Sequence, residues 1–322
     1  KDDEYILPMH RNLGVFTTRK IPLHRLFSQW QGKANGFTKG RDRSFHFGTQ
    51  DYKIIGMISH LGPQLGVADG IALSHILKNE CKITAVFSGD GGTSEGDFHE
   101  ALNVASVWSL PVLFCIENNG YGLSTPSSEQ YNCESIADRG VGYGMESHVI
   151  EGNNILEVFS KVNAIAKSVR QNPRPVLIEF KTFRMRGHEE ASGTKYVSQE
   201  LLDSWAKKDP ISNYEDYLIQ EKEISLKEIE DFKISYTEEI KNSLQLAFDE
   251  PAITPDLKTE LSDVFNPFDY SASATEPSSQ MERMRLVDAI SVGLKQSMEV
   301  HSDLVIMGQD IAEYGGVFKV TE

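Results

Sequence analysis

Short runs of apolar and β-branched residues alternate along this chain with longer segments in which apolar side chains recur every three or four positions. The runs 82–88, 111–116 and 176–180 are typical of buried strands. Between the first two runs, Ser94 and the acidic residues after it are typical of a helix start. The apolar positions that follow have helical spacing: Phe98, Ala101, Leu102, Ala105 and Trp108. Strands that alternate with helices predict an α/β fold with three layers and a mostly parallel sheet.

The second half of the chain has a different pattern. An acidic, lysine-rich helical region with a solvated face is expected over 198–248. Proline and serine are frequent over 251–280, which is the composition of a linker. Beyond it the pattern predicts an amphipathic helix and then a strand over 304–307. We therefore expect a main domain over 1–250, the linker, and over 281–322 the beginning of a further domain, which is too short to bury a core of its own.

Polar side chains follow the first two strands at the points where they end. Asp90 comes directly after the first strand, between glycines, and Asn119 lies in the loop after the second. A right-handed strand–helix–strand unit brings both ends to the same edge of the sheet. Carboxylate and amide oxygens suit Mg²⁺, which completes its shell with phosphate oxygens, and Gly89, Gly91 and Gly92 let the backbone approach such a group. Asp-Gly-Gly alone is typical of an ordinary turn. The matching asparagine is what favours a metal–diphosphate site.

Basic side chains follow the third strand. Arg184, Arg186 and His188 are spaced by two, so an extended backbone would turn all three to one side, toward an anion. A solvent-exposed basic loop is the alternative. His46 could reach a substrate, although a hydrogen-bonded structural histidine is the more common role for such a residue.

Composition excludes some partners. The chain has 32 Lys and Arg against 47 Asp and Glu, a net charge of −15, which argues against nucleic acid and anionic membrane surfaces as partners. No apolar stretch approaches 18 residues and no secretory signal is evident at the start, so we expect a cytoplasmic protein without a membrane span. Cys81, Cys115 and Cys133 have neither metal-ligand nor redox-pair spacing and are expected to be reduced thiols.

The chain resembles a known family through these same segments. Residues 89–97 and 117–126 are similar to the thiamine diphosphate motif in the α subunit of 2-oxo acid dehydrogenases, and most similar to the branched-chain enzyme. The resemblance extends over essentially the whole chain. Residues 307–320 resemble the opening of that enzyme's β subunit, which implies a fused α–β polypeptide.

This resemblance implies an activity and a set of roles. A 2-oxo acid is decarboxylated oxidatively, with branched-chain 2-oxo acids as the first choice and pyruvate or acetoin as alternatives. The acyl group passes to the lipoyl group of a partner acyltransferase, and thiamine diphosphate and Mg²⁺ are the implied cofactors. Asp90, Asn119 and the carbonyl of Tyr121 would hold Mg²⁺. The other implied positions are Arg19, Ser59, Leu61, Gly89, Gly91, Gly92, Arg184 and His188 for the cofactor, and His188 and His46 for catalysis.

The chain also departs from the family pattern. Glu189 stands where the family's regulatory serine follows the loop histidine, so phosphorylation control there does not carry over. Gln309 stands where the β subunit usually has an acidic residue. The family's glutamate that activates the aminopyrimidine of the cofactor belongs to the β portion, downstream of Glu322. A β-subunit-like domain and further copies of the chain are therefore the expected protein partners.

Two alternatives from other classes stay open. A magnesium-nucleotide binder could use the same strand ends, but the sequence Gly-x-x-x-x-Gly-Lys-Ser/Thr is absent from the chain. A non-catalytic docking half, which needs its partner domain for any turnover, is the second alternative.

Overall fold

A computed structural model of the chain describes residues 1–59, 61–189, 191–265 and 282–322. Two compact units are present, Lys1–Pro255 and Asp256–Glu322. The predicted boundaries at 250 and 280 stay predictions, because much of the expected linker lies outside the described residues.

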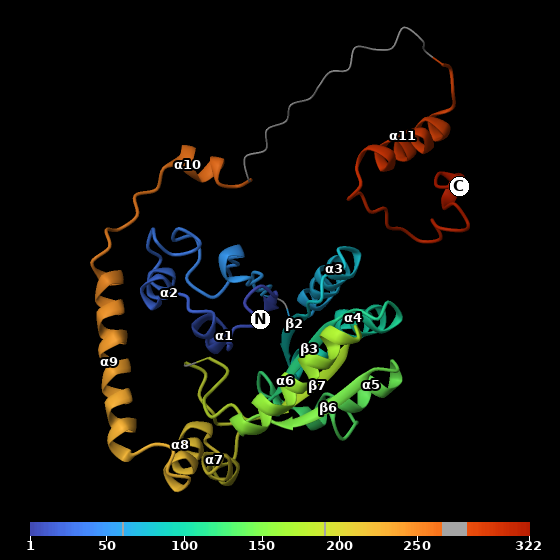
Figure 1. The fold of residues 1–322 in the computed structure, drawn as a ribbon. Helices are drawn as coiled ribbons and strands as arrows, with labels where there is room; N and C mark the ends of the chain where they lie inside the picture. Colours follow the sequence, from blue (N-terminus) through green and yellow to red (C-terminus); the bar gives the residue numbers. More distant parts are fainter. Residues whose placement is uncertain (60, 190, 266–281) are drawn as a thin grey trace. The chain divides into compact units, whose positions relative to one another are not determined.

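A five-stranded parallel sheet forms the centre of the first unit (Figure 1). Its strand order is β1-β2-β3-β7-β6, and every neighbouring pair is parallel. The strand bounds are β1 Ile6–Leu7, β2 Thr84–Gly89, β3 Val112–Asn118, β6 Glu146–Glu151 and β7 Val176–Lys181. The predicted α/β fold with a mostly parallel sheet is confirmed. A two-residue hairpin, β4 Tyr121–Gly122 with β5 Thr125–Pro126, follows β3.

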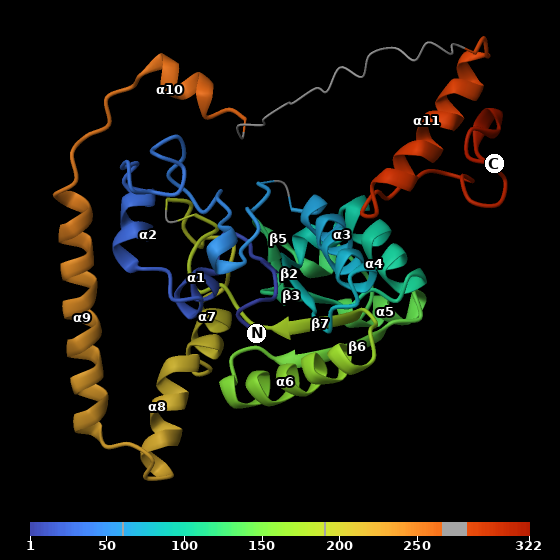
Figure 2. The same ribbon diagram turned by 45° about the horizontal axis from the view of Figure 1, so that its top comes forward.

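Helices cover both faces of this sheet, as Figure 2 shows. The helices α3 (Pro63–Leu77) and α4 (Gly96–Val107) lie over one face, and α6 (Ile155–Gln171) lies across the other. The alternation of side chains along a strand explains the two cores. In β3, Phe114 and Ile116 pack with α3 and α4, whereas Leu113 and Cys115 pack with α6. The strand is apolar from Val112 to Ile116 because both of its faces are buried there.

The start of α4 differs from the expectation. Ser94 belongs to a short 3-10 helix, η2 (Gly91–Ser94), and the N-cap residue of α4 is Glu95, with no side-chain hydrogen bond to the helix. The predicted Ser94 cap is wrong. The regular helix begins later than predicted because the glycine segment first forms one tight 3-10 turn after Asp90.

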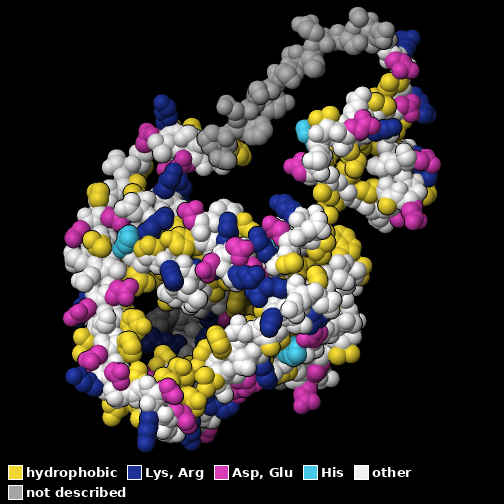
Figure 3. Space-filling view, viewed as in Figure 1, with side chains coloured by type: hydrophobic (Ala, Val, Ile, Leu, Met, Phe, Trp, Pro, Cys, Tyr) yellow, Lys and Arg dark blue, Asp and Glu magenta, His cyan; other side chains and the backbone are white. Residues whose placement is uncertain are grey.

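Segments outside the sheet form a third apolar cluster around Phe16, Leu26 and Phe47. The helix α9 (Leu226–Phe248) packs on α2 (Leu23–Trp30), so the acidic region joins the main unit. Apolar side chains border a hollow beside α8 (Pro210–Gln220) and α9 in Figure 3. The bounds of the remaining helices of this unit are α1 Leu13–Thr18, α5 Arg139–Gly142 and α7 Gln199–Ala206, with 3-10 turns η1 Gln50–Tyr52, η3 Ser127–Glu129 and η4 Ile136–Asp138.

The second unit contains α10 (Leu257–Ser262), α11 (Leu286–Val300) and a 3-10 turn, η5 (Val317–Lys319). The expected amphipathic helix is α11, and none of its side chains is buried. The strand predicted over 304–307 is wrong, because these residues have no strand partner within the described part of the chain. A strand needs a neighbour for its backbone hydrogen bonds, and pattern alone cannot supply one.

Candidate functional site

A cavity of about 550 Å³ opens at the carboxyl edge of the sheet, where β2 and β3 end. Gly89 and Glu117 are paired in the ladder, so the loops that follow them start side by side. Asp90 and Asn119, expected to converge from the strand order, both line this cavity. The other lining residues are Met9, Arg11, Leu61, Gly89, Gly91, Gly92, Ser94, Glu95, Tyr121, Gly122, Leu123, Thr125, Gln130, Arg184 and His188.

Asp90 is the buried acid of the cavity. It is only 1% exposed, and its Oδ2 has no hydrogen-bond partner. Burial raises the pKa of Asp90, while hydrogen bonds from the Asn119 backbone and the Gln130 side chain oppose that rise. A buried carboxylate oxygen without a partner is costly unless a cation or a donor meets it. This oxygen is therefore suited to contact a cation.

The loop after β3 holds Asn119 and Tyr121 beside Asp90. Asn119 Oδ1 accepts a hydrogen bond from the Tyr121 backbone N–H at 3.2 Å, which fixes a tight turn. The preceding Asn118 anchors the same loop, because its Nδ2 donates to Glu179 Oε1 at 2.6 Å and its Oδ1 accepts from Gly120 N at 3.0 Å. Two oxygen-bearing residues are thus held rigidly at the cavity wall.

The glycines after Asp90 leave room where a side chain would not fit. A Cβ on Gly92 would lie 2.5 Å from Ser88 Oγ, and one on Gly91 would lie 3.1 Å from the Cα of Gly122. The backbone here packs closely against the β4–β5 hairpin on one side. On the other it borders the cavity, where its peptide groups can approach an anion.

Two arginines and a histidine form the basic side of the cavity. Arg11 Nη2 donates to the carbonyl oxygen of His188 at 2.9 Å and lies 3.1 Å from its Nδ1, and Arg184 Nη1 lies 3.3 Å from the same nitrogen. Burial and the two guanidinium groups lower the pKa of His188. Arg184 Nε is buried without a hydrogen-bond partner. A buried donor without a partner is suited to bind an anion.

The sequence analysis did not single out Arg11. Residue Asn12 holds its loop in place, accepting from Met9 N at 2.7 Å and donating to Glu117 Oε1 at 2.6 Å. The loop follows β1, which pairs in parallel with β2, so it opens at the same edge as Asp90. The available signal was a run of polar residues, His10 to Asn12, that begins three positions after the apolar pair Ile6–Leu7.

Some expected positions lie away from the cavity. Arg19 donates to the carbonyl oxygens of Asp2 and Glu4 at 2.7 and 2.8 Å and lines a different cavity, on the α6 side of the sheet. Ser59 is exposed and absent from the lining, whereas Leu61 is part of it. Arg186 is exposed and also outside the lining. The expected convergence of three basic residues on one side therefore holds for Arg184 and His188 only.

His46 also lies outside the lining, in a hydrogen-bonded pair with another histidine. Its Nδ1 is 3.0 Å from Asp42 Oδ2, and its Nε2 is 3.1 Å from His10 Nε2. His10 stands between Met9 and Arg11, both of which line the cavity. The structure contains the hydrogen-bonded arrangement that was expected as the more common role for His46.

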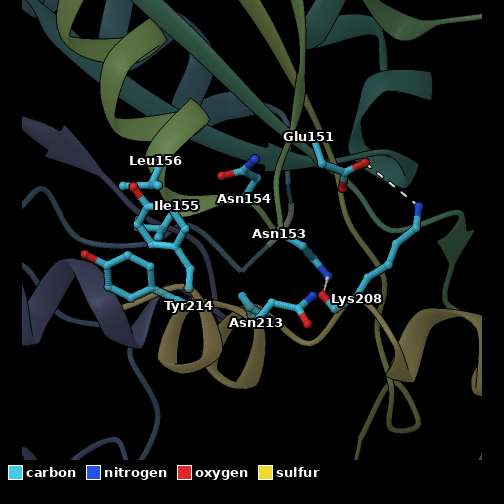
Figure 4. Close-up of a pocket in the computed structure, with 10 residues that line it drawn as sticks. Glu151, Asn153, Asn154, Ile155, Leu156, Lys208, Asn213 and Tyr214 are labelled. Atoms are coloured by element: carbon cyan, nitrogen blue, oxygen red, sulfur yellow. Dashed lines mark hydrogen bonds and ion pairs between the residues drawn. The ribbon is translucent and has the colours of Figure 1, made fainter. Parts of the chain in front are cut away.

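A third cavity, of about 490 Å³, lies between the start of α6 and α8 (Figure 4). Lys208 and Glu151 face each other across it at 3.9 Å, and Asn153 Nδ2 donates to the Lys208 carbonyl oxygen at 2.8 Å. None of the residues expected to act on a cofactor or substrate lines it. The cavity beside Asp90 is therefore the candidate site.

The chemistry of that site fits a metal–diphosphate group. Asp90 Oδ2 needs a cation, Arg184 Nε needs an anion, and the glycine backbone between β2 and α4 admits a large group. Mg²⁺ with a diphosphate supplies both charges at once. An α/β sheet with a charged cavity at its carboxyl edge is typical of proteins that bind a phosphate-bearing cofactor.

A comparison with models of known protein families identifies a family of this kind. The family model for the dehydrogenase E1 component matches residues 1–256. The chain belongs to this family, and it matches the α-type subunits. Membership implies thiamine diphosphate as cofactor, typically with Mg²⁺.

Relatives that are named for different activities are similar to this chain to a comparable degree. The α subunit of acetoin:2,6-dichlorophenolindophenol oxidoreductase from Bacillus subtilis is 33% identical over 78% of this chain and 75% of its own length. The α subunit of 3-methyl-2-oxobutanoate dehydrogenase from Mycobacterium tuberculosis is 34% identical over 77% and 65%. The mitochondrial 2-oxoisovalerate dehydrogenase α subunit of Caenorhabditis elegans is 36% identical over 67%, and the chain spans 51% of that relative. Within the described residues, no helix has both the length and the apolar character to cross a bilayer.

Proposed function

We propose that this chain is the α-type part of a 2-oxo acid dehydrogenase E1 component, and that the cavity beside Asp90 binds thiamine diphosphate with Mg²⁺. When bound, thiamine diphosphate supplies the nucleophilic carbon and the electron sink that decarboxylation of a 2-oxo acid needs. The observation that carries the proposal is the pair of buried, unpartnered atoms in one cavity, Asp90 Oδ2 and Arg184 Nε.

Asp90, Asn119 and the Tyr121 carbonyl would hold Mg²⁺ in this proposal. Oxygen ligands from a carboxylate, an amide and a carbonyl suit this hard cation, and the diphosphate completes its shell. The backbone at Gly89, Gly91 and Gly92, the side chain of Leu61 and the guanidinium of Arg184 would contact the cofactor. Arg19 and Ser59 are left out, because neither lines the cavity.

His188 would act next to the reacting atoms. Guanidinium groups only donate hydrogen bonds, so the His188 Nδ1 that faces Arg11 and Arg184 is the acceptor. The imidazole proton is then on Nε2, which can donate to a carboxylate or carbonyl oxygen. The lowered pKa of His188 keeps the ring neutral and this tautomer in place near neutral pH.

The substrate and partners belong to the proposal as well. We take branched-chain 2-oxo acids as the first choice on overall sequence similarity. Pyruvate and acetoin stay as alternatives, because an acetoin relative is 33% identical and a branched-chain relative is 34% identical. The acyl group would pass to a lipoylated acyltransferase. The resemblance of residues 307–320 to the opening of a β subunit supports a fused α–β polypeptide.

Calorimetry of Mg²⁺ and thiamine diphosphate binding tests the site. We expect Asp90→Ala to lower the affinity for the cofactor at least about tenfold, because the metal loses its charged ligand. The matched control is Asp231→Ala, an exposed aspartate of α9, which should bind as the unmodified chain does. If Asp90→Ala and the control bound the cofactor with equal affinity, the assignment of the site to this cavity would be wrong.

A further inference from the structure

Three side chains next to the cavity form one hydrogen-bonded series. Asp42 Oδ2 lies 3.0 Å from His46 Nδ1, and His46 Nε2 lies 3.1 Å from His10 Nε2. The two imidazole rings meet edge to face, with centroids 5.1 Å apart and planes at 88°. The Ser44 backbone N–H donates to the other Asp42 oxygen at 2.7 Å and holds the carboxylate toward His46. The series joins the loop after α2 to the loop after β1.

Hydrogen-bond chemistry limits where protons can lie in this series. The Ser44 hydrogen bond and His46 lower the pKa of Asp42, so it is a carboxylate and accepts from His46 Nδ1–H. Only one proton fits between the two Nε2 atoms. It belongs to His10 when His46 is neutral, and to His46 when His46 is a cation. A proton taken up at His10 Nδ1 therefore ends as a positive charge on His46, beside Asp42.

The charges around the cavity favour His46 as the place for that proton. Burial and the nearby His46, Arg11 and His188 lower the pKa of His10. Burial and the charges of Arg11 and Arg184 likewise lower the pKa of His188, whereas the charge of Glu189 raises it. A cation on either of these two histidines is thus repelled, whereas a cation on His46 contacts a carboxylate. Within the described residues no protein group bonds His10 Nδ1, which leaves that nitrogen to exchange its proton.

We propose that Asp42, His46 and His10 are a proton relay that supplies the proton consumed by acyl transfer to the lipoyl disulfide. This inference rests on the proposed function. In that reaction the bond between the 2-oxo carbon and the carboxylate breaks and releases carbon dioxide, and the acyl carbon is oxidised by two electrons. The disulfide is reduced by the same two electrons, one sulfur takes the acyl group, and the other takes a proton.

One proton from outside the reactants is needed in each cycle, because a carboxylate and a disulfide give a thioester, a thiol and neutral carbon dioxide. His10, which stands between the lining residues Met9 and Arg11, releases its Nδ1 proton while the Nε2 proton of His46 moves to His10 Nε2. His46 is then neutral and still bonded to Asp42. Both His46 and Asp42 are partly exposed, at 29% and 36% of their side-chain surface, so solvent can return the proton. The three are positioning and relay residues, and His188 remains the residue at the reacting atoms.

The test compares two electron acceptors in the assembled enzyme with its β-type part. The lipoyl disulfide takes up a proton on reduction, whereas ferricyanide takes only electrons. We expect His10→Gln and Asp42→Asn to lower lipoyl-coupled kcat about tenfold or more relative to ferricyanide-coupled kcat, since general acid help of this kind is worth about 10² to 10⁴. Asp42→Glu should recover part of the loss. His148→Gln, which changes a histidine paired with Glu146 on β6, is the control and should leave the ratio unchanged.

Equal losses with both acceptors would overturn the relay. Absence of any ferricyanide-coupled turnover in the unmodified enzyme would instead count against the proposed function, so the two failures are distinguishable.

Discussion

Two arginines in this chain stand in similar polar surroundings in the sequence but in different places in the molecule. Arg11 lines the cavity beside Asp90 and contacts His188. Arg19 lies one short helix further on and turns toward the carbonyl oxygens of the first residues. The resemblance to the family named Arg19 as a diphosphate contact, but the geometry favours Arg11. Burial also lowers the pKa of Arg11, as expected for a guanidinium that lacks an anion.

This pair gives a matched test at the residue scale. We expect Arg11→Gln to weaken thiamine diphosphate binding in Mg²⁺ several-fold, because a charged donor to the anion and to His188 is lost. Arg19→Gln should leave binding unchanged. Calorimetry of the two variants side by side is the measurement. A loss confined to Arg19→Gln would restore the expectation from the sequence.

The difference between these arginines shows which parts of the site could be predicted from the sequence and which could not. Asp90 and Asn119 were brought to one edge correctly, because each follows a long apolar strand and parallel strands end together. Arg11 could not be placed in that way. Its strand, β1, is only Ile6–Leu7, too short for a periodic pattern, and its register depends on pairing with β2, far along the chain. The Asp42–His46–His10 series depends on two loops that meet only in the folded protein.

At the scale of elements, α3 contains an aspartate in a place where apolar residues are usual. Asp69 is 5% exposed, and its Oδ1 has no hydrogen-bond partner. Burial raises the pKa of Asp69 from its ordinary 3.8 to about 8. The helix forms nonetheless because Leu65, Ala68 and Ala72 supply its packing on the sheet. The aspartate therefore opposes stability where it must ionise.

This predicts a pH dependence of stability with a definite sign. Between about pH 4 and pH 8 the folded protein keeps a proton on Asp69 that the unfolded chain releases, so stability falls as pH rises through this window. Asp69→Asn removes this pH-dependent contribution to stability, because an amide does not ionise in this range. We expect its melting temperature to exceed that of the unmodified protein by a few degrees at pH 8 and to match it near pH 4. Asp231→Asn, on the exposed face of α9, is the control. Parallel curves for Asp69→Asn and the unmodified protein would contradict the raised pKa.

At the scale of the whole molecule, the chain contains one compact unit with the cavity and a second unit with little buried surface. All the side chains of α11 are at least partly exposed, although its apolar positions have helical spacing. An amphipathic helix of that kind is stabilised by packing on another surface. A β-type domain, which α-type E1 subunits work with, would offer such a surface.

We therefore expect residues 1–322 alone to bind thiamine diphosphate but to show no measurable oxidation of 2-oxo acids. The family's activating glutamate belongs to the β portion, and general acid–base help of this kind is worth about 10² to 10⁴ in rate. Turnover should appear when a β-type part is supplied in the same polypeptide or as a separate chain. Strong activity from a sample whose intact mass ends at Glu322 would exclude this composite site.

The position of Cys115 in the central strand has a practical consequence. Burial, aided by the charge of Glu117, raises the pKa of this thiol to about 12, and it is only 4% exposed. Alkylating reagents attack the thiolate, so this sulfur is protected both by access and by protonation. Cys81 is exposed and Cys133 is partly exposed, and both can react while the sheet stays closed. The rate at which Cys115 is alkylated, compared with the rates for Cys81 and Cys133, therefore reports how often β3 opens in the native protein.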